Sequence, residues 1–246
     1  MTTLFISDLH LQPSQPRILQ AGLEFLRTTA RGAEALYILG DLFEVWVGDD
    51  DDAAWLPELR DTLNALHQAG TRLYFLHGNR DFLLGKNFAA QCGFELLPEA
   101  VVIDLYGRKT LLMHGDTLCT EDREYLAMRA QLHNPLWQQA ALSKSLAERR
   151  QLAAALRMES KSAGAQKSAE IMDVTPDEVM RVMEQHGVDL LIHGHTHRPA
   201  RHSLSVSGPS GVKPAERIVL GDWGNQLWYL RASADGQLDL IAKALA

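Results

Sequence analysis

The sequence has few cysteines and no long hydrophobic run. Cys92 and Cys119 are the two cysteines among 246 residues, and they lie far apart without metal-ligand spacing. This usage predicts reduced thiols in a cytosolic protein, and it excludes a disulfide framework. No run reaches the length of a membrane span, and the N-terminus, MTTLFISDLHL, lacks the features of a signal peptide. We therefore expect a protein that is made and kept in the cytoplasm.

The sequence also lacks an excess of positive charge. It has 24 Lys and Arg against 31 Asp and Glu, a formal net charge of −7. A general nucleic-acid-binding protein would normally show a basic surface, so we expect no nucleic acid partner. A phosphate-bearing substrate would need a local positive centre on such an acidic protein. The hydrophobic content of 46% is ample for a globular core.

Short apolar runs and helical spacing indicate the fold class. Five runs are short enough for buried strands; they cover residues 3–6, 35–39, 72–76, 109–113 and 188–192. Helical spacing over 17–30 and 53–68 separates the first three runs by the length of a βαβ unit. The sequence TPDE at 175–178 predicts another helix, with Thr175 as its N-cap in a capping box.

Three more runs near the C-terminus suggest a second sheet. Residues 217–223, 226–232 and 237–242 lie close together with turn residues between them. This spacing favours antiparallel strands that close a second sheet. The sequence therefore predicts an α/β protein with a two-sheet α/β/β/α sandwich.

Polar residues with metal-ligand chemistry follow the five apolar runs. In chain order they are Asp8, His10, Asp41, Asn79, His114, His195 and His197. Because ligands of α/β sheets bind outside the carboxyl ends of the strands, we expect these side chains to converge at one edge. The segment LIHGHTHRPA at 191–200 also contains His193, and if it is extended its three histidines project to the same side.

The number and type of these residues indicate two metal ions. Two carboxylates, one amide and four imidazoles exceed the about four to six ligands that one ion takes, and one Asp could bridge two ions. Two divalent ions would leave a positive surplus, which is the centre that a phosphate needs. Oxygen and imidazole ligands without thiolate suit Mn, Fe or Zn, and of these we expect manganese.

Five ordered motifs carry a family resemblance. DLH, GD, GNRD, HGD and GHTH resemble the signature of the calcineurin-like metallophosphoesterases. The resemblance implies that the first metal binds the ligand set Asp8, His10 and His197. It implies that the second metal binds the set Asn79, His114 and His195. Asp41 then bridges the two ions, and His193 lies outside the ligand set, where it orients a ligand or a neighbouring loop.

Arg80 departs from the superfamily pattern. In most of these enzymes a His follows the ligand Asn and can protonate the leaving group, but here Arg80 stands at that position. Arginine cannot act as a general acid, but it can bind a phosphate through two parallel hydrogen bonds. A leaving phosphate monoester, with a second pKa of roughly 6, needs no added proton. Arg80 therefore favours a phosphoanhydride substrate.

Longer motifs narrow the resemblance. HGNRDF, HGDTLCTED, GDWG and a long insert after the fourth ligand are similar to the UDP-2,3-diacylglucosamine pyrophosphohydrolases of lipid A synthesis, over essentially the whole chain. This resemblance implies that water attacks the α-phosphate of UDP-2,3-diacylglucosamine to give UMP and 2,3-diacylglucosamine 1-phosphate (lipid X). It implies two manganese ions and a cytoplasmic enzyme bound peripherally to the inner membrane. The implied catalytic residues are Asp41, Asn79, Arg80, His114 and His195.

The insert, at about 121–170 of a single domain spanning 1–246, is predicted to form helices. Its apolar positions are Leu126, Leu132, Leu136, Trp137, Leu142, Leu146, Leu152 and Leu156. Such a stripe usually packs against its own domain, whereas the resemblance implies a lid over an acyl-chain chamber. From 121 to 168, eight basic residues against five acids could meet anionic lipid or the nucleotide. The substrate contacts that the resemblance implies are Asn79, Arg80, Asp122, Ser160, Lys167 and His195; Gly164 stands where relatives carry a polar side chain.

Several alternatives stay open. The substrate could be another anhydride, such as a dinucleoside polyphosphate, or a cyclic nucleotide, and some proteins of this fold are binding scaffolds with decayed metal sites. The acidic run 49–52 lacks the spacing of a calcium loop and predicts a solvated loop that caps the following helix. We expect an ordinary surface or core role for His133. His77 could support the site or simply pack at a strand end.

Overall fold

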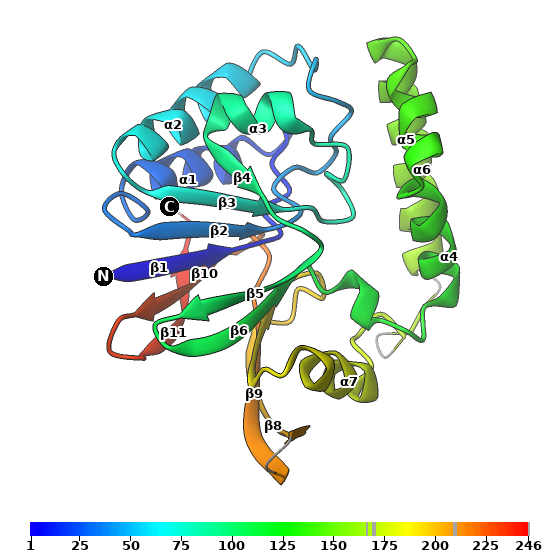
Figure 1. Cartoon of the computed structure of the whole chain (residues 1–246). Helices are drawn as coiled ribbons and strands as arrows, with labels where there is room; N and C mark the ends of the chain where they lie inside the picture. The colour runs from blue at the N-terminus through cyan, green and yellow to red at the C-terminus, as the bar shows by residue number, and fades with distance from the viewer. Residues whose placement is uncertain (166, 169–170, 209–210, 246) are drawn as a thin grey trace.

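The computed structural model describes residues 1–165, 167–168, 171–208 and 211–245 (Figure 1). The first sheet has six strands in the order β11-β10-β1-β2-β3-β4. Their bounds are β1 Thr2–Ile6, β2 Ala35–Leu39, β3 Arg72–Leu76, β4 Phe94–Leu96, β10 Gln226–Ser233 and β11 Leu238–Ala244. β1 to β4 are parallel, whereas β10 runs antiparallel to both β1 and β11. The strands expected at 3–6, 35–39 and 72–76 are thus confirmed.

The second sheet has five strands in the order β5-β6-β7-β9-β8. Their bounds are β5 Ala100–Leu105, β6 Arg108–Met113, β7 Leu190–His193, β8 Ala200–Gly208 and β9 Gly211–Val219. β6, β7 and β9 are parallel, and β5 and β8 pair antiparallel at the two edges. The strands expected at 109–113 and 188–192 are confirmed as β6 and β7.

The prediction for the C-terminal runs was partly wrong. β9 does belong to the second sheet, but β10 and β11 extend the first sheet by pairing with β1. Turn spacing predicted the antiparallel pair β10 and β11 correctly, but β9 does not pair with β10, and the spacing could not identify the sheet that each strand joins. The five strands that precede the candidate ligands are divided between the two sheets: β1, β2 and β3 belong to the first, and β6 and β7 belong to the second.

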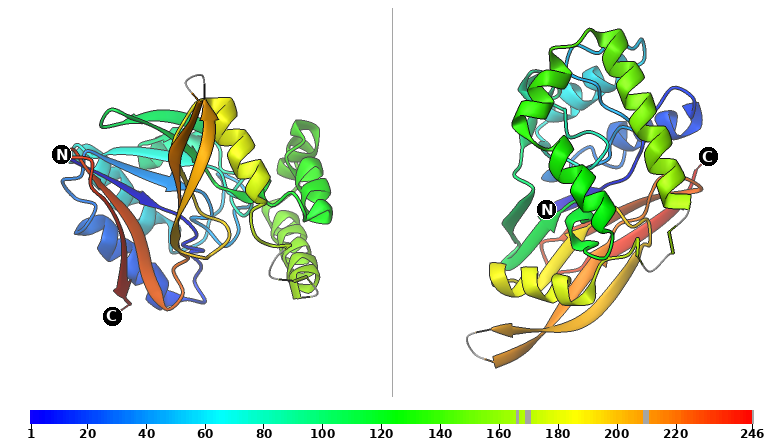
Figure 2. Two further views of the ribbon diagram at one scale, coloured as in Figure 1. Left: turned by 90° about the horizontal axis from the view of Figure 1, so that it is seen from below. Right: turned by 90° about the vertical axis from the view of Figure 1, so that its right-hand side faces the viewer.

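Four helices cover the outer faces of the sandwich. α1 Pro16–Arg27, α2 Leu56–Gln68 and α3 Lys86–Cys92 lie on the first sheet, and α7 Pro176–His186 lies against the second (Figures 1 and 2). Thr175 is the N-cap of α7 as predicted, but its side chain makes no cap hydrogen bond. Instead Thr120 donates to the Thr175 hydroxyl at 2.6 Å, which ties the helix to the start of the insert.

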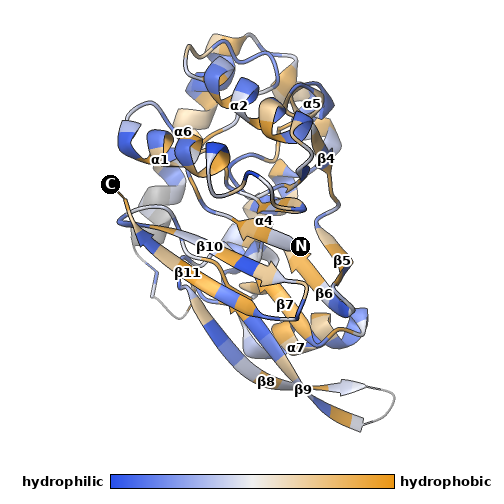
Figure 3. Cartoon of the chain, turned by 90° about the vertical axis from the view of Figure 1, so that its left-hand side faces the viewer, coloured by the Kyte–Doolittle hydropathy of each residue, from blue (hydrophilic) through white to orange (hydrophobic). Residues whose placement is uncertain are grey.

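Three buried clusters establish the four layers. Leu4 and Ile6 pack with α1 to α3, whereas Phe5 between them packs with the second sheet, as the period-2 alternation of a strand requires. On the second sheet, Leu111 packs toward α7 and Leu112 toward the first sheet. Figure 3 shows the buried strands β6 and β7 as largely hydrophobic. The α/β/β/α sandwich is confirmed.

The insert forms three helices beside the sandwich. α4 Arg123–Leu132, α5 Pro135–Leu142 and α6 Leu146–Ala165 follow a short 3-10 turn at Asp116–Leu118 (Figures 1 and 2). None of the helices in the described part of the chain combines the length and hydrophobicity that a membrane span requires. Cys92 and Cys119 are both buried, and burial raises the pKa of each thiol to about 12, consistent with packing roles.

The acidic run 49–52 is a partly solvated loop, with Asp50 and Asp52 exposed as predicted, but it does not cap the helix that follows it. Asp49 accepts hydrogen bonds from the backbone N–H groups of Gly85, Asn87 and Phe88 at 2.8, 3.0 and 3.0 Å. It therefore caps α3 rather than the helix that follows it in sequence. The next three carboxylates, Asp50, Asp51 and Asp52, pair with arginines of α6. These partners could not be predicted from sequence, because they lie about a hundred residues away along the chain.

We expect Asp49→Ala to lower the free energy of unfolding by about 2 kcal/mol, because a lost helix cap costs up to about that amount. The matched control is Asp52→Ala, since the Asp52 side chain is 74% exposed and an exposed ion pair is worth less than about 1 kcal/mol. Urea unfolding of both variants measures the difference. Equal stability of the two variants would contradict the capping role.

Candidate metal centre

The seven predicted ligands lie at one end of the sandwich. Asp8 and His10 follow β1, Asp41 follows β2 and Asn79 follows β3. The other three side chains come from the second sheet, after β6 and β7. The prediction that all seven converge was right, but two sheets supply them, because the carboxyl ends of both sets of parallel strands meet there.

Asp8, His10 and His197 form the first group. His197 Nε2 lies 3.4 Å from Asp8 Oδ1 and 3.2 Å from His10 Nε2, and His10 Nε2 lies 4.0 Å from the same Asp8 oxygen. Asp8 Oδ1 is buried, and among the described residues it has no hydrogen-bond partner. An unsatisfied buried carboxylate oxygen facing two imidazole nitrogens fits a cation between them.

Asn79, His114 and His195 form the second group. Asn79 Oδ1 lies 3.0 Å from His114 Nε2 and 3.1 Å from His195 Nδ1. His114 Nδ1 lies 2.8 Å from the Leu39 carbonyl oxygen. Because a ring N–H on Nδ1 then donates to that carbonyl, Nε2 keeps its lone pair for a metal.

Asp41 lies between the two groups. Its Oδ1 is 3.7 Å from His114 Nε2, and its Oδ2 is 3.9 Å from His10 Nε2. Asp8, Asp41 and His114 also bring their ligand atoms within 4.8 Å of one another. The carboxylate is 2% exposed, so the two oxygens reach opposite groups from a fixed position. This geometry fits a ligand shared by two ions.

The backbone at the ligands is unusual. Five of the seven ligand residues have φ between 49° and 68°, a region that non-glycine residues rarely adopt; they are Asp8, His10, Asp41, His195 and His197. Such conformations persist only where the surrounding structure over-determines them, and they cluster at functional sites. At Gly78, an added Cβ would lie 2.1 Å from Asp41 Oδ1, so the close approach of β3 to the site needs glycine.

Buried charges set the electrostatics of the centre. Burial lowers the pKa of His114, but Asp41 and Asp8 outweigh burial and raise it to about 9. Burial and the charge of His114 lower the pKa of His195 to about 4. The carboxylates thus attract positive charge into this space, and metal binding would displace a proton from His114.

Asp81 holds two of the ligand loops. It accepts hydrogen bonds from the backbone N–H groups of Leu42 and Gly78, both at 2.8 Å. Burial, followed by the charge of Asp41, raises its pKa to about 6. Asp81 is the last residue of the motif GNRD, but this supporting role was not predicted from the sequence.

His193 does not share a face with His195 and His197. β7 ends at His193, and the left-handed backbone of the two later histidines turns the chain, so the extended interpretation of 191–200 was wrong. His193 is fully buried, its Nδ1 lies 2.9 Å from the Gly194 carbonyl, and Arg217 donates to its Nε2 at 3.3 Å. Burial and Arg217 lower its pKa to about 3. The imidazole thus holds the loop that carries His195.

Two roles were open for His77, support of the site and packing at a strand end, and its contacts fit packing. Its Nε2 lies 2.7 Å from the Leu84 carbonyl oxygen, and its ring meets Phe75 edge-on. Within the described residues, His77 makes no hydrogen bond, ion pair or ring contact with a candidate ligand side chain. It therefore fixes the loop after β3.

A cleft lined by charged and polar side chains, and by apolar ones as well, opens beside the metal centre. Its volume is about 1010 Å³, and its lining includes all six predicted contact residues, Asn79, Arg80, Asp122, Ser160, Lys167 and His195. Lys167 Nζ donates to Asp122 Oδ1 at 2.5 Å, which joins the end of the insert to its beginning. The structure therefore brings the six residues to one cleft, although they are spread over positions 79–195 of the sequence.

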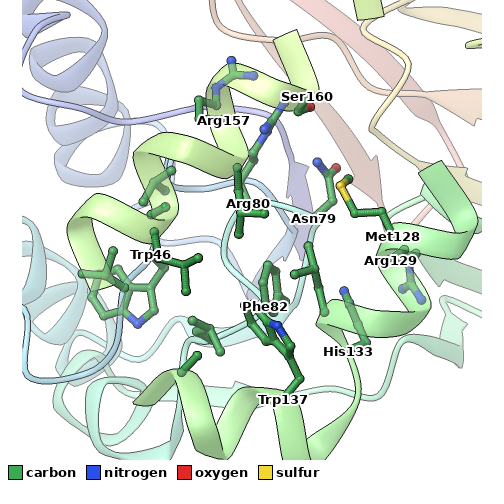
Figure 4. Close-up of a pocket in the computed structure, with 18 of the residues that line it drawn as sticks. Trp46, Asn79, Arg80, Phe82, Met128, Arg129, His133, Trp137, Arg157 and Ser160 are labelled. Atoms are coloured by element: carbon green, nitrogen blue, oxygen red, sulfur yellow. The ribbon is translucent and has the colours of Figure 1, made fainter. Parts of the chain in front are cut away.

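An apolar chamber adjoins the cleft under the insert (Figure 4). Trp46 and Phe82 line it from the sandwich, and Trp137, Leu152 and Leu156 line it from α5 and α6. Leu136 and Leu142 do not join this stripe, because their exposed fractions are 75% and 43%. The helical stripe thus faces the sandwich across a small cavity of about 80 Å³, with two of its predicted members turned outward.

Arg80 lies where the cleft and the chamber meet (Figure 4). Its backbone N–H donates to Asp41 Oδ1 at 2.8 Å, which places the side chain beside the centre. Its Nε is buried without a hydrogen-bond partner among the described residues. A buried cationic donor in this position fits an anionic ligand.

Tyr125 and Arg129 of α4 were missed from sequence. The Tyr125 hydroxyl and Arg129 Nε both donate to Asp116 Oδ2 at 2.5 Å. The Tyr125 ring lies 5.8 Å from the His195 ring. Asp116, two residues after His114, therefore anchors the first helix of the insert against the metal centre.

His133 has a larger role than expected. It lines the chamber, and its ring stacks on Phe82 with centroids 5.1 Å apart. Burial, followed by the charge of Arg129, lowers its pKa to about 4. The unfolded chain takes up this proton as the pH falls below about 6.5, whereas the folded protein resists it until about 4. The stabilisation is complete above the first value and is lost as the pH falls through the second.

We therefore expect His133→Phe, which keeps the stack without a titrating group, to lose less stability than the unchanged protein between pH 7 and pH 4.5. Partial exposure screens the effect, so the expected difference is about 1 kcal/mol. Urea unfolding at the two pH values measures it. The same loss in both proteins would contradict the role of His133.

The sandwich and the paired ligand groups define the class of protein. The family model described as Calcineurin-like phosphoesterase matches residues 1–199. Three relatives named UDP-2,3-diacylglucosamine hydrolase extend this similarity. The protein of Cellvibrio japonicus is 56% identical, with coverage of 96% of this chain and 97% of the relative. The protein of Pseudomonas aeruginosa (strain PAO1) is 52% identical, with coverage of 96% of this chain and 97% of the relative. The protein of Salmonella arizonae is 51% identical, with coverage of 98% of this chain and 99% of the relative. The chain belongs to the UDP-2,3-diacylglucosamine hydrolases, a family of calcineurin-like phosphoesterases.

Proposed function

We propose that this chain hydrolyses the pyrophosphate bond of UDP-2,3-diacylglucosamine in lipid A synthesis, releasing UMP and 2,3-diacylglucosamine 1-phosphate (lipid X). One observation carries the proposal: Asn79 and Arg80 line both the cleft beside the metal centre, with its charged side chains, and the apolar chamber. A substrate with a diphosphate and acyl chains needs these two environments side by side. The relatives' shared name supports the same reaction.

Two manganese ions are the proposed cofactors. Asp8, His10 and His197 would hold the first, Asn79, His114 and His195 the second, and Asp41 both. Oxygen and imidazole donors without thiolate favour manganese over a softer ion. When bound, the ions would lower the pKa of water to make a nucleophile and would neutralise phosphate charge.

Arg80 is the side chain, apart from the candidate metal ligands, that we assign to the reaction itself. Its guanidinium would bind the diphosphate through paired hydrogen bonds and hold negative charge as the bond breaks. Water attacks the α-phosphate, the bond to the bridging oxygen breaks, and lipid X leaves as a phosphate monoester that needs no proton. Asp41, Asn79, His114 and His195 would act by holding the ions beside that phosphate.

The insert would act as a lid over the acyl chains. Trp46, Phe82, Trp137, Leu152 and Leu156 offer the chains an apolar surface. The polar residues Asp122, Ser160 and Lys167, at the cleft side of the insert, would contact the sugar or its phosphate. Closure of the lid would also keep bulk water from the centre.

Contact with the inner membrane would use the outer face of this lid. Most basic side chains of the insert pair with carboxylates of the chain itself; these are Arg129, Arg149, Arg150, Arg157 and Lys167. Leu136 and Met158, each 75% exposed, remain as apolar groups that a bilayer surface could cover. The proposed location is therefore cytoplasmic and peripheral to that membrane.

The test is hydrolysis of UDP-2,3-diacylglucosamine by metal-stripped protein, with and without added manganese. UDP-N-acetylglucosamine, which lacks the long chains, is the matched control. Manganese-dependent release of UMP from the acylated substrate alone is the expected result. Equal hydrolysis of both substrates would overturn the lid assignment, and hydrolysis of neither would overturn the proposed reaction.

A further inference from the structure

Glu44 lies between the insert and the metal centre. The Arg157 Nε of α6 donates to its Oε1, and its Oε2 lies 3.1 Å from His10 Nδ1. The Glu44 side chain is 17% exposed, and its backbone N–H donates to the Leu11 carbonyl at 3.2 Å. One carboxylate therefore contacts both a lid arginine and a ligand imidazole from a fixed backbone position.

Glu44 Oε2 makes an ion-pair contact with His10 Nδ1, a buried nitrogen that has no hydrogen bond of standard geometry among the described residues, and this contact leaves the other ring nitrogen facing the site. With Nδ1 beside Glu44, Nε2 points to Asp8 Oδ1 and His197 Nε2, at 4.0 and 3.2 Å. A carboxylate on the outer nitrogen of a ligand histidine holds its tautomer and orientation and raises its basicity. Loss of that carboxylate should weaken the first ligand group without touching any ligand.

The contact with Arg157 reaches the lid. Arg157 lines both the cleft and the chamber, so its position reports how α6 sits on the sandwich (Figure 4). The other ion pairs of α6 end on Asp50, Asp51 and Asp52, in a loop that supplies none of the ligand residues. Among the insert's ion pairs within the described residues, the pair with Glu44 is the one whose carboxylate also contacts a ligand imidazole.

We propose that Glu44 is a positioning residue that couples docking of α6 to metal binding by Asp8, His10 and His197. Docked Arg157 holds the carboxylate against His10, and a metal-bound His10 in turn holds the carboxylate toward Arg157. Such coupling is reciprocal: metal should stabilise the docked helix by the same factor by which the docked helix strengthens metal binding. This inference goes beyond the proposed function, because it does not depend on which anhydride is cleaved.

Two substrate-free measurements test the coupling in the full-length protein. Manganese titration of metal-stripped protein gives the two site affinities, and hydrogen exchange with and without manganese gives the protection of 150–160. The variants are Glu44→Gln and Arg157→Gln. The matched control is Arg150→Gln, which breaks an α6 ion pair that ends on Asp51 and Asp52.

For Glu44→Gln we expect about 10-fold weaker manganese binding at one site, in the range typical of lost outer contacts, and no manganese-induced protection of 150–160. Arg157→Gln should show a smaller loss of affinity and the same loss of protection. Arg150→Gln should keep both the affinity and the protection of the unchanged protein. If Glu44→Gln does not fold, Arg157→Gln carries the test, because it leaves the carboxylate in place.

Two outcomes would overturn the proposal. Unchanged manganese affinity in Glu44→Gln would remove its role at His10, and unchanged manganese-induced protection in both variants would remove the link to the lid. Neither measurement uses substrate. A failure of the proposed reaction would instead appear as absent UMP release by protein that behaves as expected in both.

Discussion

Asp41→Ala is expected to remove bound metal and catalytic turnover together. The two oxygens of Asp41 lie 3.7 Å from His114 Nε2 and 3.9 Å from His10 Nε2, so its loss deprives both ligand groups of a carboxylate. Metal ions contribute several kcal/mol to phosphoryl-transfer catalysis, and about 1.36 kcal/mol is tenfold in rate. The expected loss of UMP release is therefore at least about 1,000-fold. Elemental analysis after gel filtration, on the same sample as the assay, measures metal content.

The matched control for Asp41→Ala is Asp61→Ala, since the Asp61 side chain is 71% exposed and lies in α2. It removes the same charge from the chain without reaching the centre. We expect unchanged metal content and unchanged turnover for this variant. Retention of both metals with full activity in Asp41→Ala would show that this carboxylate does not bridge the site.

The convergence of the candidate ligands could be predicted from sequence because strand geometry is local. A buried strand needs a short apolar run, and a side chain just after such a run must lie at the strand's carboxyl end. Asp8, Asp41 and Asn79 followed this rule on the first sheet, and His114 followed it on the second. The rule gives the end of each strand, but it does not give the sheet. The division of the centre between two sheets, and the addition of β10 and β11 to the first, depend on long-range packing.

The errors within the site have a backbone cause. The alternate histidines at 193, 195 and 197 indicated an extended segment, but His195 and His197 adopt φ of 68° and 56°. A local preference cannot predict a conformation that L-residues normally avoid. Contacts from elsewhere impose it here: Asp8 Oδ2 accepts the backbone N–H of His195 at 2.9 Å.

The contacts of the insert could not be predicted from the sequence, for a different reason. Helices were predictable from 121–170, but side-chain charge does not identify a partner about a hundred residues away. Arg149 is 5% exposed, and it donates to the Val47 carbonyl at 2.6 Å and to Asp50 Oδ1 at 2.7 Å. A basic face expected to meet lipid or nucleotide thus largely docks the insert on its own sandwich. The ion pairs between the acidic run 49–52 and the arginines of α6 form only when folding brings the two segments together.

Arg80→Ala is expected to slow the reaction while leaving the metals bound. The Arg80 backbone N–H, which remains in the variant, makes the hydrogen bond to Asp41 Oδ1, so the ligand should keep its position. The lost side chain removes two charge-assisted hydrogen bonds, each worth about 1.5–3 kcal/mol, which corresponds to at least about 100-fold in kcat/KM. Elemental analysis should give unchanged metal content. A joint loss of metal and activity would instead make Arg80 a support of the ligand loops.

Arg80→His tests why the chain has arginine at this position. A histidine can donate a proton to a leaving alkoxide, whereas arginine cannot. Relative to the unchanged protein, the variant should lose activity on the diphosphate, because it gives up paired hydrogen bonds. On an alkyl phosphodiester, whose leaving alkoxide needs that proton, it should lose less or gain. The measurement is the ratio of the kcat/KM values for the two substrates. Loss of metal would lower both values alike and leave this ratio unchanged. A shifted ratio therefore reports leaving-group chemistry. An unchanged ratio would mean that charge alone, and not the inability to give a proton, decides the choice of bond.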